Sequence, residues 1–316
     1  MTTLDLEWDQ LSLTQWREKF AQLPRSGMLQ SLPYARAMRR IMAQTPHFAL
    51  IRVNGEEAGL VQTLEISLLG GLIHTFILDR GPLWFEGYGS QEHVLAFFKE
   101  INRRYPRRFG RKRRLIPEVS QNLGINFGAL GYRTVSETNP YQTIWMDLTP
   151  EPETLRASLK QKWRNSLNKA ERQGLKFDTA LEPQALLRFL QDYEAQQTAR
   201  SYRNISAKDL PIFLEEFAKD QTVLLAQAYK KKDAPLAQAL IFLHGRSATW
   251  QIGTVSNAGR DLCANHFLLW HVISTLRAQG INDFDLGGVN DEDAAGIRNF
   301  KTGLGGQAVT LSGLYT

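Results

Sequence analysis

Hydrophobic and polar residues alternate in two widely separated segments, and the two segments follow the same order. Residues 48–71 read FALIRVNGEEAGLVQTLEISLLGG, and residues 223–245 read VLLAQAYKKKDAPLAQALIFLHG. In each, a strand-like run leads through a polar turn into a second alternating run, which is typical of adjacent β-strands. Four matched positions recur 176 residues later: Ala58, Leu60, Gln62 and Leu64 correspond to Ala234, Leu236, Gln238 and Leu240.

The order of elements continues in the same way after both segments. Each is followed by a third strand, then an apolar helix, then a further strand: LIHTFILDRG, HVLAFFKEINRRY and RRLIPEV in the first copy, ATWQIGTVSN, HFLLWHVISTLRAQG and INDFDLGG in the second. A shared order of five elements predicts that one α/β unit occurs twice. We place the boundary at the short linker Thr149–Pro152, which gives expected domains 1–150 and 151–316. The expected fold class is α/β (α+β), each domain a mixed, mainly antiparallel sheet flanked by helices.

The last stretch of the second copy carries the densest candidate chemistry. An alternating strand ends at Gly287 and Gly288, and a short helical segment containing Phe300 and Lys301 follows, with glycines at 303, 305 and 306. Two glycines at a strand end allow a ligand to approach the backbone closely. A lysine in a glycine-rich surround is suited to hold an anion or a developing oxyanion.

Two basic segments point to a polyanionic ligand. Residues 103–114 read RRYPRRFGRKRR, with eight basic residues in twelve, and we expect Arg107, Arg108 and Arg111 to bind phosphate. Residues 155–175 predict one basic helix, because Leu155, Leu159, Trp163 and Leu167 form a stripe at helical spacing. We expect its Lys160 and Arg164 to contact the same ligand.

Composition narrows the class of protein. The 316-residue chain is 43% hydrophobic and 22% charged, with a net charge of +6, as expected for a globular protein. The single cysteine, Cys263, excludes an intrachain disulfide and a cysteine-rich metal site. The N-terminal residues do not form a signal peptide and no apolar run is long enough to span a membrane, so we expect a cytoplasmic protein. Contact with a membrane surface is left open.

The ordered set of motifs resembles the Fem family of non-ribosomal peptidyltransferases, built from two tandem GCN5-related N-acetyltransferase (GNAT) domains. The resemblance rests on LDRGPLW at 78–84, RRLIPE at 113–118, LKQKWRNSLNKAERQGL at 159–175 and the stretch 265–306, which ends in IRNFKTGLGG. It implies an aminoacyltransferase that moves an amino acid from aminoacyl-tRNA to an amine of a peptidoglycan precursor. It also implies that no cofactor is needed, since aminoacyl-tRNA is a co-substrate.

The resemblance also implies roles for particular residues. Phe300 and Lys301 match the family's Phe-Lys pair, whose lysine stabilises the reaction centre. The family's acceptor-binding arginine corresponds to Arg200 or Arg203, beside Tyr202. A first-domain lysine that holds the acceptor phosphate has no clear match, and Arg36, Arg39 and Arg40 lie nearby. That departure leaves the identity of the acceptor open.

The chemistry needs a neutral amine to attack the ester carbonyl of the donor, with a positive charge near the resulting oxyanion. We expect Lys301 to supply that charge. Asp285 is a candidate for the amine's proton, as are Asp291 and Asp293, although all three also suit turn and capping roles. His244, His266 and His271 lack ligand spacing and a companion nucleophile, so we expect neither a metal site nor a catalytic triad.

Two other functions stay open. A coenzyme A-dependent N-acyltransferase would act on a polysaccharide or small metabolite. However, SNAGRDLCANHFLLW, at 256–270, and FEGYGSQEHVLAFF, at 85–98, lack the usual glycine-rich pyrophosphate loop. A non-enzymatic RNA-binding protein on the same fold would suit the basic segments, but would not need the Phe300-Lys301 pair.

Overall fold

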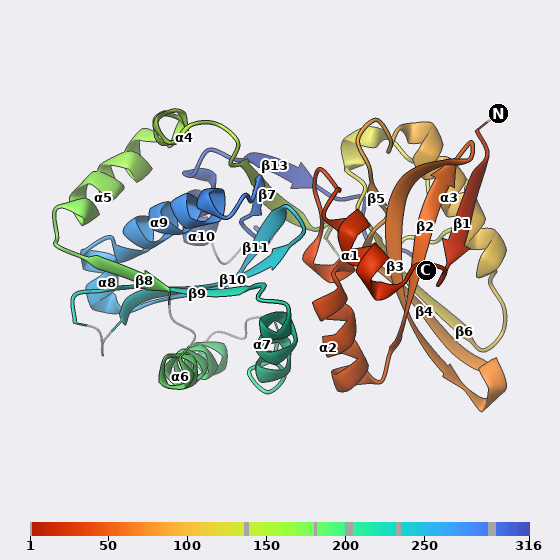
Figure 1. The fold of residues 1–316 in the computed structure, drawn as a ribbon, viewed down its shortest axis with the longest axis horizontal. Coiled ribbons are helices and arrows are strands. Elements are labelled where there is room, and N and C mark those ends of the chain that lie inside the picture. Colours follow the sequence, from red (N-terminus) through yellow and green to blue (C-terminus); the bar gives the residue numbers. More distant parts are fainter. Residues whose placement is uncertain (1, 136–138, 180–181, 200–204, 232–234, 290–294) are drawn as a thin grey trace. The chain divides into compact units, whose positions relative to one another are not determined.

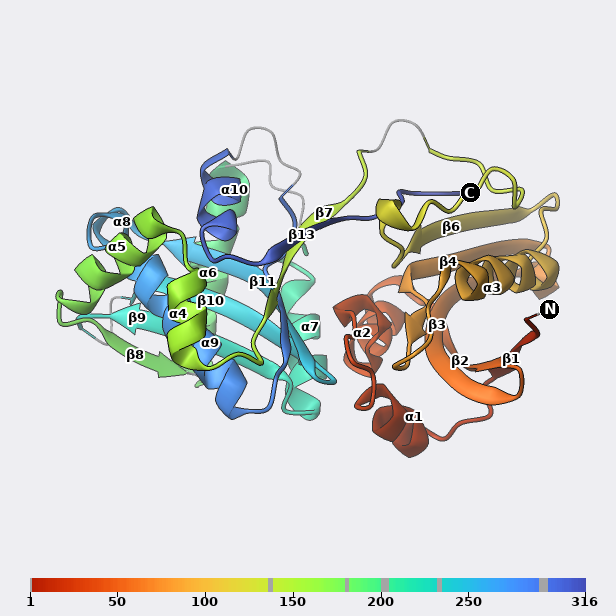
Figure 2. The ribbon, with the colours of Figure 1, turned by 90° about the horizontal axis from the view of Figure 1, so that it is seen from above.

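The computed structural model describes residues 2–135, 139–179, 182–199, 205–231, 235–289 and 295–316. The chain forms two compact units. Unit 1 comprises 1–142, 244–246 and 309–316, and unit 2 comprises 143–243 and 247–308. Each unit is a sheet with helices on both faces (Figures 1 and 2). Within the described residues, no helix is long and apolar enough to cross a membrane.

The sheet of unit 1 has the order β1-β2-β3-β4-β6, with the short β5 paired to β3. Strands β1 to β4 pair antiparallel, whereas β6 lies parallel to β4 after the crossover helix α3. The strands of unit 1 are β1 (Leu4–Trp8), β2 (Thr45–Val53), β3 (Glu56–Leu68), β4 (Ile73–Gly81), β5 (Leu83–Trp84) and β6 (Arg111–Pro117). Its helices are α1 (Leu13–Phe20), η1 (Met28–Gln30), α2 (Leu32–Met42), η2 (Leu69–Gly71), α3 (Gln91–Arg104) and η3 (Gln121–Leu123).

Alternation along the strands divides the core of unit 1 between the two faces of its sheet. Leu50 and Leu60 pack with Trp16 and Phe20 of α1. Their neighbours along the strands, Ala49, Ile51 and Val61, instead pack with Phe97 and Phe98 of α3. Successive strand side chains point to opposite faces, so a continuous apolar run can serve both helical layers.

The sheet of unit 2 has the order β13-β7-β12-β11-β10-β9-β8. Here too β12 lies parallel to its neighbour β11 after a helical crossover, and β9 and β10 pair antiparallel. Its strands are β7 (Gln142–Asp147), β8 (Lys176–Thr179), β9 (Val223–Tyr229), β10 (Pro235–His244), β11 (Ser247–Val255), β12 (Asp283–Asp285) and β13 (Gln307–Thr310). Its helices are α4 (Pro152–Ser158), α5 (Gln161–Glu171), α6 (Pro183–Ala199), α7 (Leu210–Lys219), α8 (Asn257–Asp261), α9 (Ala264–Ala278) and α10 (Ala295–Thr302).

The shared order of elements confirms the predicted repeat of the fold. The pairing of β3 with β4, followed by α3 and the parallel strand β6, corresponds to β10, β11, α9 and β12 in unit 2. Gln62 and Gln238, which the repeat pairs in sequence, are both buried on the matching strands. A mixed sheet with a helical crossover to a parallel strand in each unit is the expected tandem GNAT-like arrangement.

The basic segment after the linker forms two helices, so the prediction of one helix is wrong. α4 ends at Ser158 and α5 begins at Gln161, although the whole apolar stripe is buried as expected. The glycine-rich turn after α10 packs against the chain at this break. The backbone N–H of Lys160 donates to the carbonyl of Gly303 at 2.9 Å. A Cβ at Gly305 would lie 2.7 Å from the carbonyl oxygen of Ser158, which explains the glycine.

Candidate functional site

Lys301 lies in unit 2, where α10 packs against the carboxyl end of β12. Its side chain is 7% exposed, and its Nζ donates to the carbonyl oxygen of Gly288 at 2.9 Å. The adjacent carbonyl, that of Val289, accepts two hydrogen bonds from the guanidinium of Arg298, at 3.0 and 2.7 Å. Consecutive carbonyls after the strand therefore fix α10, and with it the position of the ammonium group.

The glycine at the strand end is required by this geometry. Gly287 has φ of +76°, in the left-handed region, and an added Cβ would lie 3.0 Å from the carbonyl oxygen of Trp250 and 3.4 Å from the Nζ of Lys301. A side chain at this position would be strained and would press on the ammonium. The predicted glycine pair thus has distinct tasks: Gly287 leaves room, and Gly288 supplies the acceptor.

Phe300 and Trp250 build the apolar wall around the ammonium. The Nζ of Lys301 lies 5.4 Å from the centroid of the Trp250 ring, within cation–π range. The Phe300 ring contacts the rings of Trp163, Trp250 and His266, with centroid distances of 5.9, 6.2 and 4.9 Å. Phe300 therefore anchors α10 onto α5 and α9, which holds the next residue in the pocket.

Burial lowers the pKa of Lys301 to about 8, and the nearby charge of Asp285 partly opposes that shift. Asp285 is itself buried on β12. Its carboxylate accepts hydrogen bonds from the hydroxyl of Thr143 and from the backbone N–H of Gly287, the latter at 2.9 Å. Near neutral pH the ammonium form predominates, so the site presents a cation in a surround of low polarity, where its field is strong.

A pocket of about 390 Å³ opens beside this lysine within unit 2. Its apolar wall is formed by the side chains of Trp250, Val255, Ile297 and Phe300. Its polar lining comes from Gln196 of α6, Gln251 of β11, Arg260 of α8 and Asn265 of α9, with Lys301 itself also in the lining. An acyl group with one apolar and one polar end would suit such a lining.

The tryptophan of the pocket is held in place by its own strand. Its indole N–H donates to the carbonyl oxygen of Ile252 at 2.9 Å. An added Cβ at Gly253 would lie 2.6 Å from the indole ring, so only glycine leaves room for it. Sequence reasoning missed Trp250, Arg260, Asn265 and Gln196 as site residues. The available signal for Trp250, Arg260 and Asn265 was their position in the third strand and the helical crossover of the second copy, whereas Gln196 of α6 carried none.

The remaining predicted residues are placed as follows. Lys160 and Arg164 lie at the start of α5, whose Trp163 packs on Phe300, so these cations belong to the unit that holds Lys301. Arg39 is exposed in the last turn of α2 in unit 1. Predicted residues that fall outside the described part of the chain are Arg200, Tyr202, Arg203, Asp291 and Asp293.

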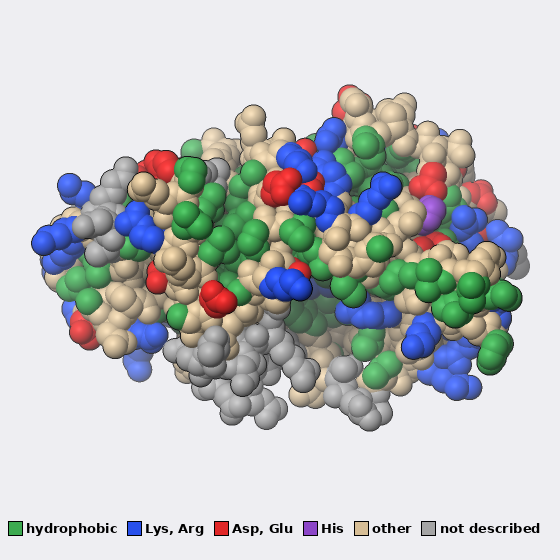
Figure 3. Space-filling view, turned by 90° about the horizontal axis from the view of Figure 1, so that it is seen from below, with side chains coloured by type: hydrophobic (Ala, Val, Ile, Leu, Met, Phe, Trp, Pro, Cys, Tyr) green, Lys and Arg blue, Asp and Glu red, His purple; other side chains and the backbone are tan. Residues whose placement is uncertain are grey.

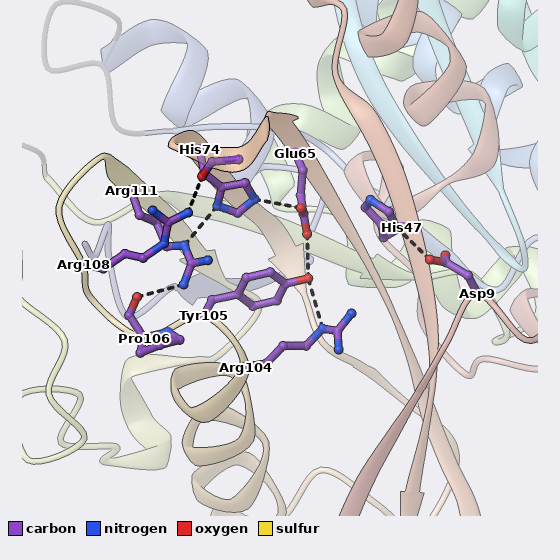
Figure 4. Close-up of polar contacts among 10 residues, drawn as sticks. Asp9, His47, Glu65, His74, Arg104, Tyr105, Pro106, Arg108 and Arg111 are labelled. Atoms are coloured by element: carbon purple, nitrogen blue, oxygen red, sulfur yellow. Dashed lines mark hydrogen bonds and ion pairs between the residues drawn. The ribbon is translucent and has the colours of Figure 1, made fainter. Parts of the chain in front are cut away.

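The arginine-rich segment of unit 1 contains both exposed and buried basic residues. It spans the end of α3, a turn and the start of β6, and its Arg113 is buried. Lys and Arg side chains occupy several places on the face in Figure 3. Arg111 is half-buried, where its Nε donates to the Nδ1 of His74 at 3.1 Å, as Figure 4 shows. Arg108 is exposed but donates to the carbonyls of Gly71 and Leu72, and Arg107 donates to Thr316.

The histidines of unit 2 that the sequence set aside lie in α9. Burial lowers the pKa of His266 to about 4, and burial also lowers the pKa of His271. Both rings pack against aromatic side chains in tilted arrangements: His266 lies 4.9 Å from Trp163, and His271 lies 4.3 Å from Phe267, measured between centroids. A neutral ring among aromatic groups suits a packing role.

Comparisons with known proteins agree with this fold. The profile of the acetyltransferase (GNAT) domain matches residues 157–302. The structure of FemX is similar with a TM-score of 0.78 and 14% identity, over 98% of this chain and 96% of that chain. A conserved protein of unknown function from Bacteroides thetaiotaomicron gives a TM-score of 0.60 and 11% identity, with 98% of each chain covered.

A third similar structure is the C-terminal domain of a protein provisionally named a lysylphosphatidylglycerol synthetase, from Agrobacterium fabrum. It gives a TM-score of 0.52 and 17% identity, over 80% of this chain and 83% of that chain. No curated protein matches this sequence. The chain therefore consists of two tandem GNAT-like domains, its residues 157–302 match the GNAT acetyltransferase family, and its fold is the one that FemX adopts.

Proposed function

We propose that this protein is an acyltransferase that moves an aminoacyl group from aminoacyl-tRNA to an amine of an acceptor, such as a peptidoglycan precursor peptide. The observation that carries the proposal is the buried ammonium of Lys301, held beside a pocket by the carbonyl of Gly288. The fold shared with FemX supports the donor, and the neighbouring Lys160 and Arg164 supply positive charge for its phosphates.

In this mechanism the neutral amine of the acceptor attacks the carbonyl carbon of the ester that joins the amino acid to the tRNA 3′ end. A carbon–nitrogen bond forms, and the carbonyl oxygen becomes an oxyanion that Lys301 stabilises electrostatically. When the intermediate collapses, the ester carbon–oxygen bond breaks and the 3′ oxygen leaves. The proton lost by the amine ends on that 3′ oxygen, so atoms and charge balance without an added reagent.

Asp285 has a supporting role in this proposal. Its carboxylate already accepts from Thr143 and from the N–H of Gly287, and its charge favours the protonated form of Lys301. Through the Gly287 N–H it also fixes the strand end that supplies the acceptor for Lys301. We therefore treat Asp285 as a residue that positions and charges the lysine. Because the donor is charged tRNA, we place the reaction in the cytoplasm.

A coenzyme A-dependent N-acyltransferase is the second candidate, because the GNAT acetyltransferase profile matches residues 157–302. The crossover segment weighs against it. A Cβ at Gly259 would lie 2.1 Å from the carbonyl oxygen of Leu236, and the Gly259 N–H donates to the hydroxyl of Ser256. This glycine therefore serves the packing of α8 on β10, and its N–H is already engaged within the protein.

The donor can be identified directly. The protein is incubated with a mixture of charged tRNAs or with acetyl-coenzyme A, together with candidate amines, and new amides are detected by mass spectrometry. Amide formed only with charged tRNA supports the proposal. Amide formed only with acetyl-coenzyme A selects the second candidate. Tight tRNA binding with neither product indicates an RNA-binding protein without this activity.

The Lys301→Ala variant tests whether this site carries the reaction. Removing the cation should lower kcat/KM by about 100-fold or more while the circular dichroism spectrum stays the same. Lys162→Ala is the matched control, because Lys162 is exposed on α5 in the same unit. A Lys301→Ala rate within about twofold of wild type would remove Lys301 from the mechanism.

A further inference from the structure

An exposed apolar tip lies at one end of the sheet of unit 1. Five of the nine large hydrophobic side chains that the described residues expose lie on two neighbouring loops here. Four of them lie on the β3–β4 hairpin, with exposed fractions of 55% for Leu68, 73% for Leu69, 69% for Leu72 and 49% for Ile73. The fifth, Phe109 in the α3–β6 turn, is fully exposed. So many large apolar side chains in water are costly, and such patches commonly mark interaction sites.

The two loops are joined by hydrogen bonds, so that the tip is one surface. The N–H of His74 donates to the carbonyl of Gly110 at 2.8 Å. The guanidinium of Arg108 donates to the carbonyls of Gly71 and Leu72 in the hairpin. A Cβ at Gly110, where φ is +77°, would lie 2.1 Å from the carbonyl oxygen of Leu72, so glycine alone permits this approach. We call these two loops, 68–73 and 106–112, the apolar tip.

The hairpin continues past the strand beside it. The last pairing of β3 with β2 joins Glu65 to Thr45, whereas the pairing of β3 with β4 runs on to Leu68 and Ile73. Three further residues extend the hairpin by roughly 10 Å. That length matches the depth of about 5–10 Å to which peripheral proteins insert apolar groups into a bilayer interface.

A polar network joins the base of the hairpin to the second loop, and Figure 4 shows its contacts. The carboxylate of Glu65 accepts from the hydroxyl of Tyr105 at 2.6 Å and contacts the Nε2 of His74 at 2.8 Å. Because the Nδ1 of His74 accepts from Arg111, its Nε2 carries the proton that is donated to Glu65. The acidic group of the hairpin is thus engaged internally, which leaves positive charge to dominate the surface.

Exposed cations accompany the apolar side chains. Arg104 lies just before the second loop, and Arg107, Arg108 and Lys112 lie within it. Figure 3 shows Lys and Arg side chains next to hydrophobic ones on its right-hand side. Apolar side chains next to cations complement a bilayer with anionic headgroups, where each cation contributes about 1 kcal/mol near the surface. A nucleic acid would use the cations but not the exposed leucines.

We propose that the apolar tip docks on the surface of a membrane that contains anionic lipid, with Leu69, Leu72 and Phe109 inserted among the headgroups and the cations at the phosphates. The proposal concerns unit 1 alone and does not depend on which acyl donor unit 2 uses. It gives the protein a route to acceptors that are carried in a membrane.

Co-sedimentation with vesicles tests the docking. Wild-type protein should bind vesicles of phosphatidylcholine with 30% phosphatidylglycerol, and bind vesicles of pure phosphatidylcholine at least about tenfold less. The triple variant Leu69→Ser, Leu72→Ser, Phe109→Ser should bind the anionic vesicles at least about tenfold less than wild type. Leu13→Ser with Leu187→Ser is the matched control, since both leucines are exposed elsewhere, and it should bind like wild type. No vesicle binding by wild type, or full binding by the triple variant, would overturn the proposal.

A fluorescent label distinguishes insertion from surface attraction. Phe109→Cys in a Cys263→Ser background, labelled with an environment-sensitive dye, should shift its emission to shorter wavelength on anionic vesicles. The same dye at Leu13→Cys should not shift. Lys112→Glu with Arg107→Glu should weaken vesicle binding, whereas Lys230→Glu with Lys231→Glu should leave it unchanged. If the Lys112 and Arg107 changes instead weaken RNA binding and the label never shifts, the tip is an RNA surface.

Discussion

The ammonium of Lys301 lies 5.4 Å from the centre of the Trp250 ring, and the same nitrogen donates to the carbonyl of Gly288 at 2.9 Å. The ring and the carbonyl each favour the charged form, whereas burial favours the neutral form. The result is a lysine whose pKa is lowered to about 8. Its charge therefore changes within an experimentally accessible range of pH.

The activity should show an alkaline limb set by this lysine. If the ammonium form is the active one, kcat/KM falls about tenfold per pH unit above pH 8, as Lys301 loses its proton. Lys301→Arg, which stays charged over this range, should lack that limb whatever its absolute rate. A rate that rises through pH 8 and then levels off would instead identify the neutral amine as the active form.

The same shift predicts a gain in stability when the lysine is replaced. The folded pKa is about 8 and the unfolded value is 10.5, so below pH 8 the folded protein holds a charge that burial disfavours. Lys301→Met should raise the free energy of unfolding by about 1–3 kcal/mol at pH 7, less the contribution of the hydrogen bond to Gly288. The free energy of unfolding of the wild type rises between pH 8 and 10.5, so the difference in stability between Lys301→Met and the wild type should disappear over this range. Urea unfolding at several pH values measures it, and a pH-independent gap would contradict the assigned shift.

Gly287→Ala should lower both stability and activity. Its φ of +76° strains any side chain, and its Cβ would press on the Trp250 carbonyl and the Lys301 Nζ. Gly280→Ala is a matched control, because Gly280 has φ of +78° but nothing within 4 Å of the added Cβ. Both variants should lose about 1–2 kcal/mol from backbone strain, and only Gly287→Ala should also lose activity. Equal rates for the two variants would show that close packing at Gly287 is unimportant.

Arg260 lies on the lining of the pocket and is exposed, so in the proposed reaction it is the residue we expect to meet a phosphate of the donor. Arg260→Ala should raise the KM for the donor by about threefold to tenfold at low salt, with kcat little changed. The effect should shrink at high salt. Arg172→Ala, an exposed arginine just after α5, should leave KM as in wild type. A change in kcat alone would assign Arg260 to the reacting centre.

The fold followed from the sequence because strand and crossover patterns recur in it. The alternating pattern predicted strands around Leu60 and Gln62 and again around Leu236 and Gln238. The structure has β3 and β10 at these positions. The basic helix did not follow, because its apolar stripe is continuous while its backbone breaks at Leu159. The cause is remote in sequence: the turn at Gly303 and Gly305 fills the break. Local periodicity contains no information about such a partner.

The candidate site was predictable where side chains are close in sequence, as for Phe300 with Lys301 and for the glycines with Asp285. Trp250 lies on β11, which pairs parallel with β12, and Arg260 lies on α8, which follows β11. The sequence predicts this order of elements but not the contacts between their side chains. The arginine-rich segment was a single run in sequence, yet its members face different surroundings. Arg113 is buried, Arg111 binds His74, and Arg108 binds the hairpin. Charge density alone does not say which arginines are exposed.

The division of the chain between its two units has a practical consequence. Residues 309–316 belong to unit 1, where the Tyr315 ring stacks on Phe127 at 4.3 Å and its backbone bridges to Leu115 and Thr134. The final residues thus complete a hydrophobic core built from the opposite end of the sequence. Cleavage between Leu148 and Pro152 would yield two fragments, neither of which holds a whole unit. Expression of either half alone should give an unstable product, whereas co-expression of both halves should restore a folded one.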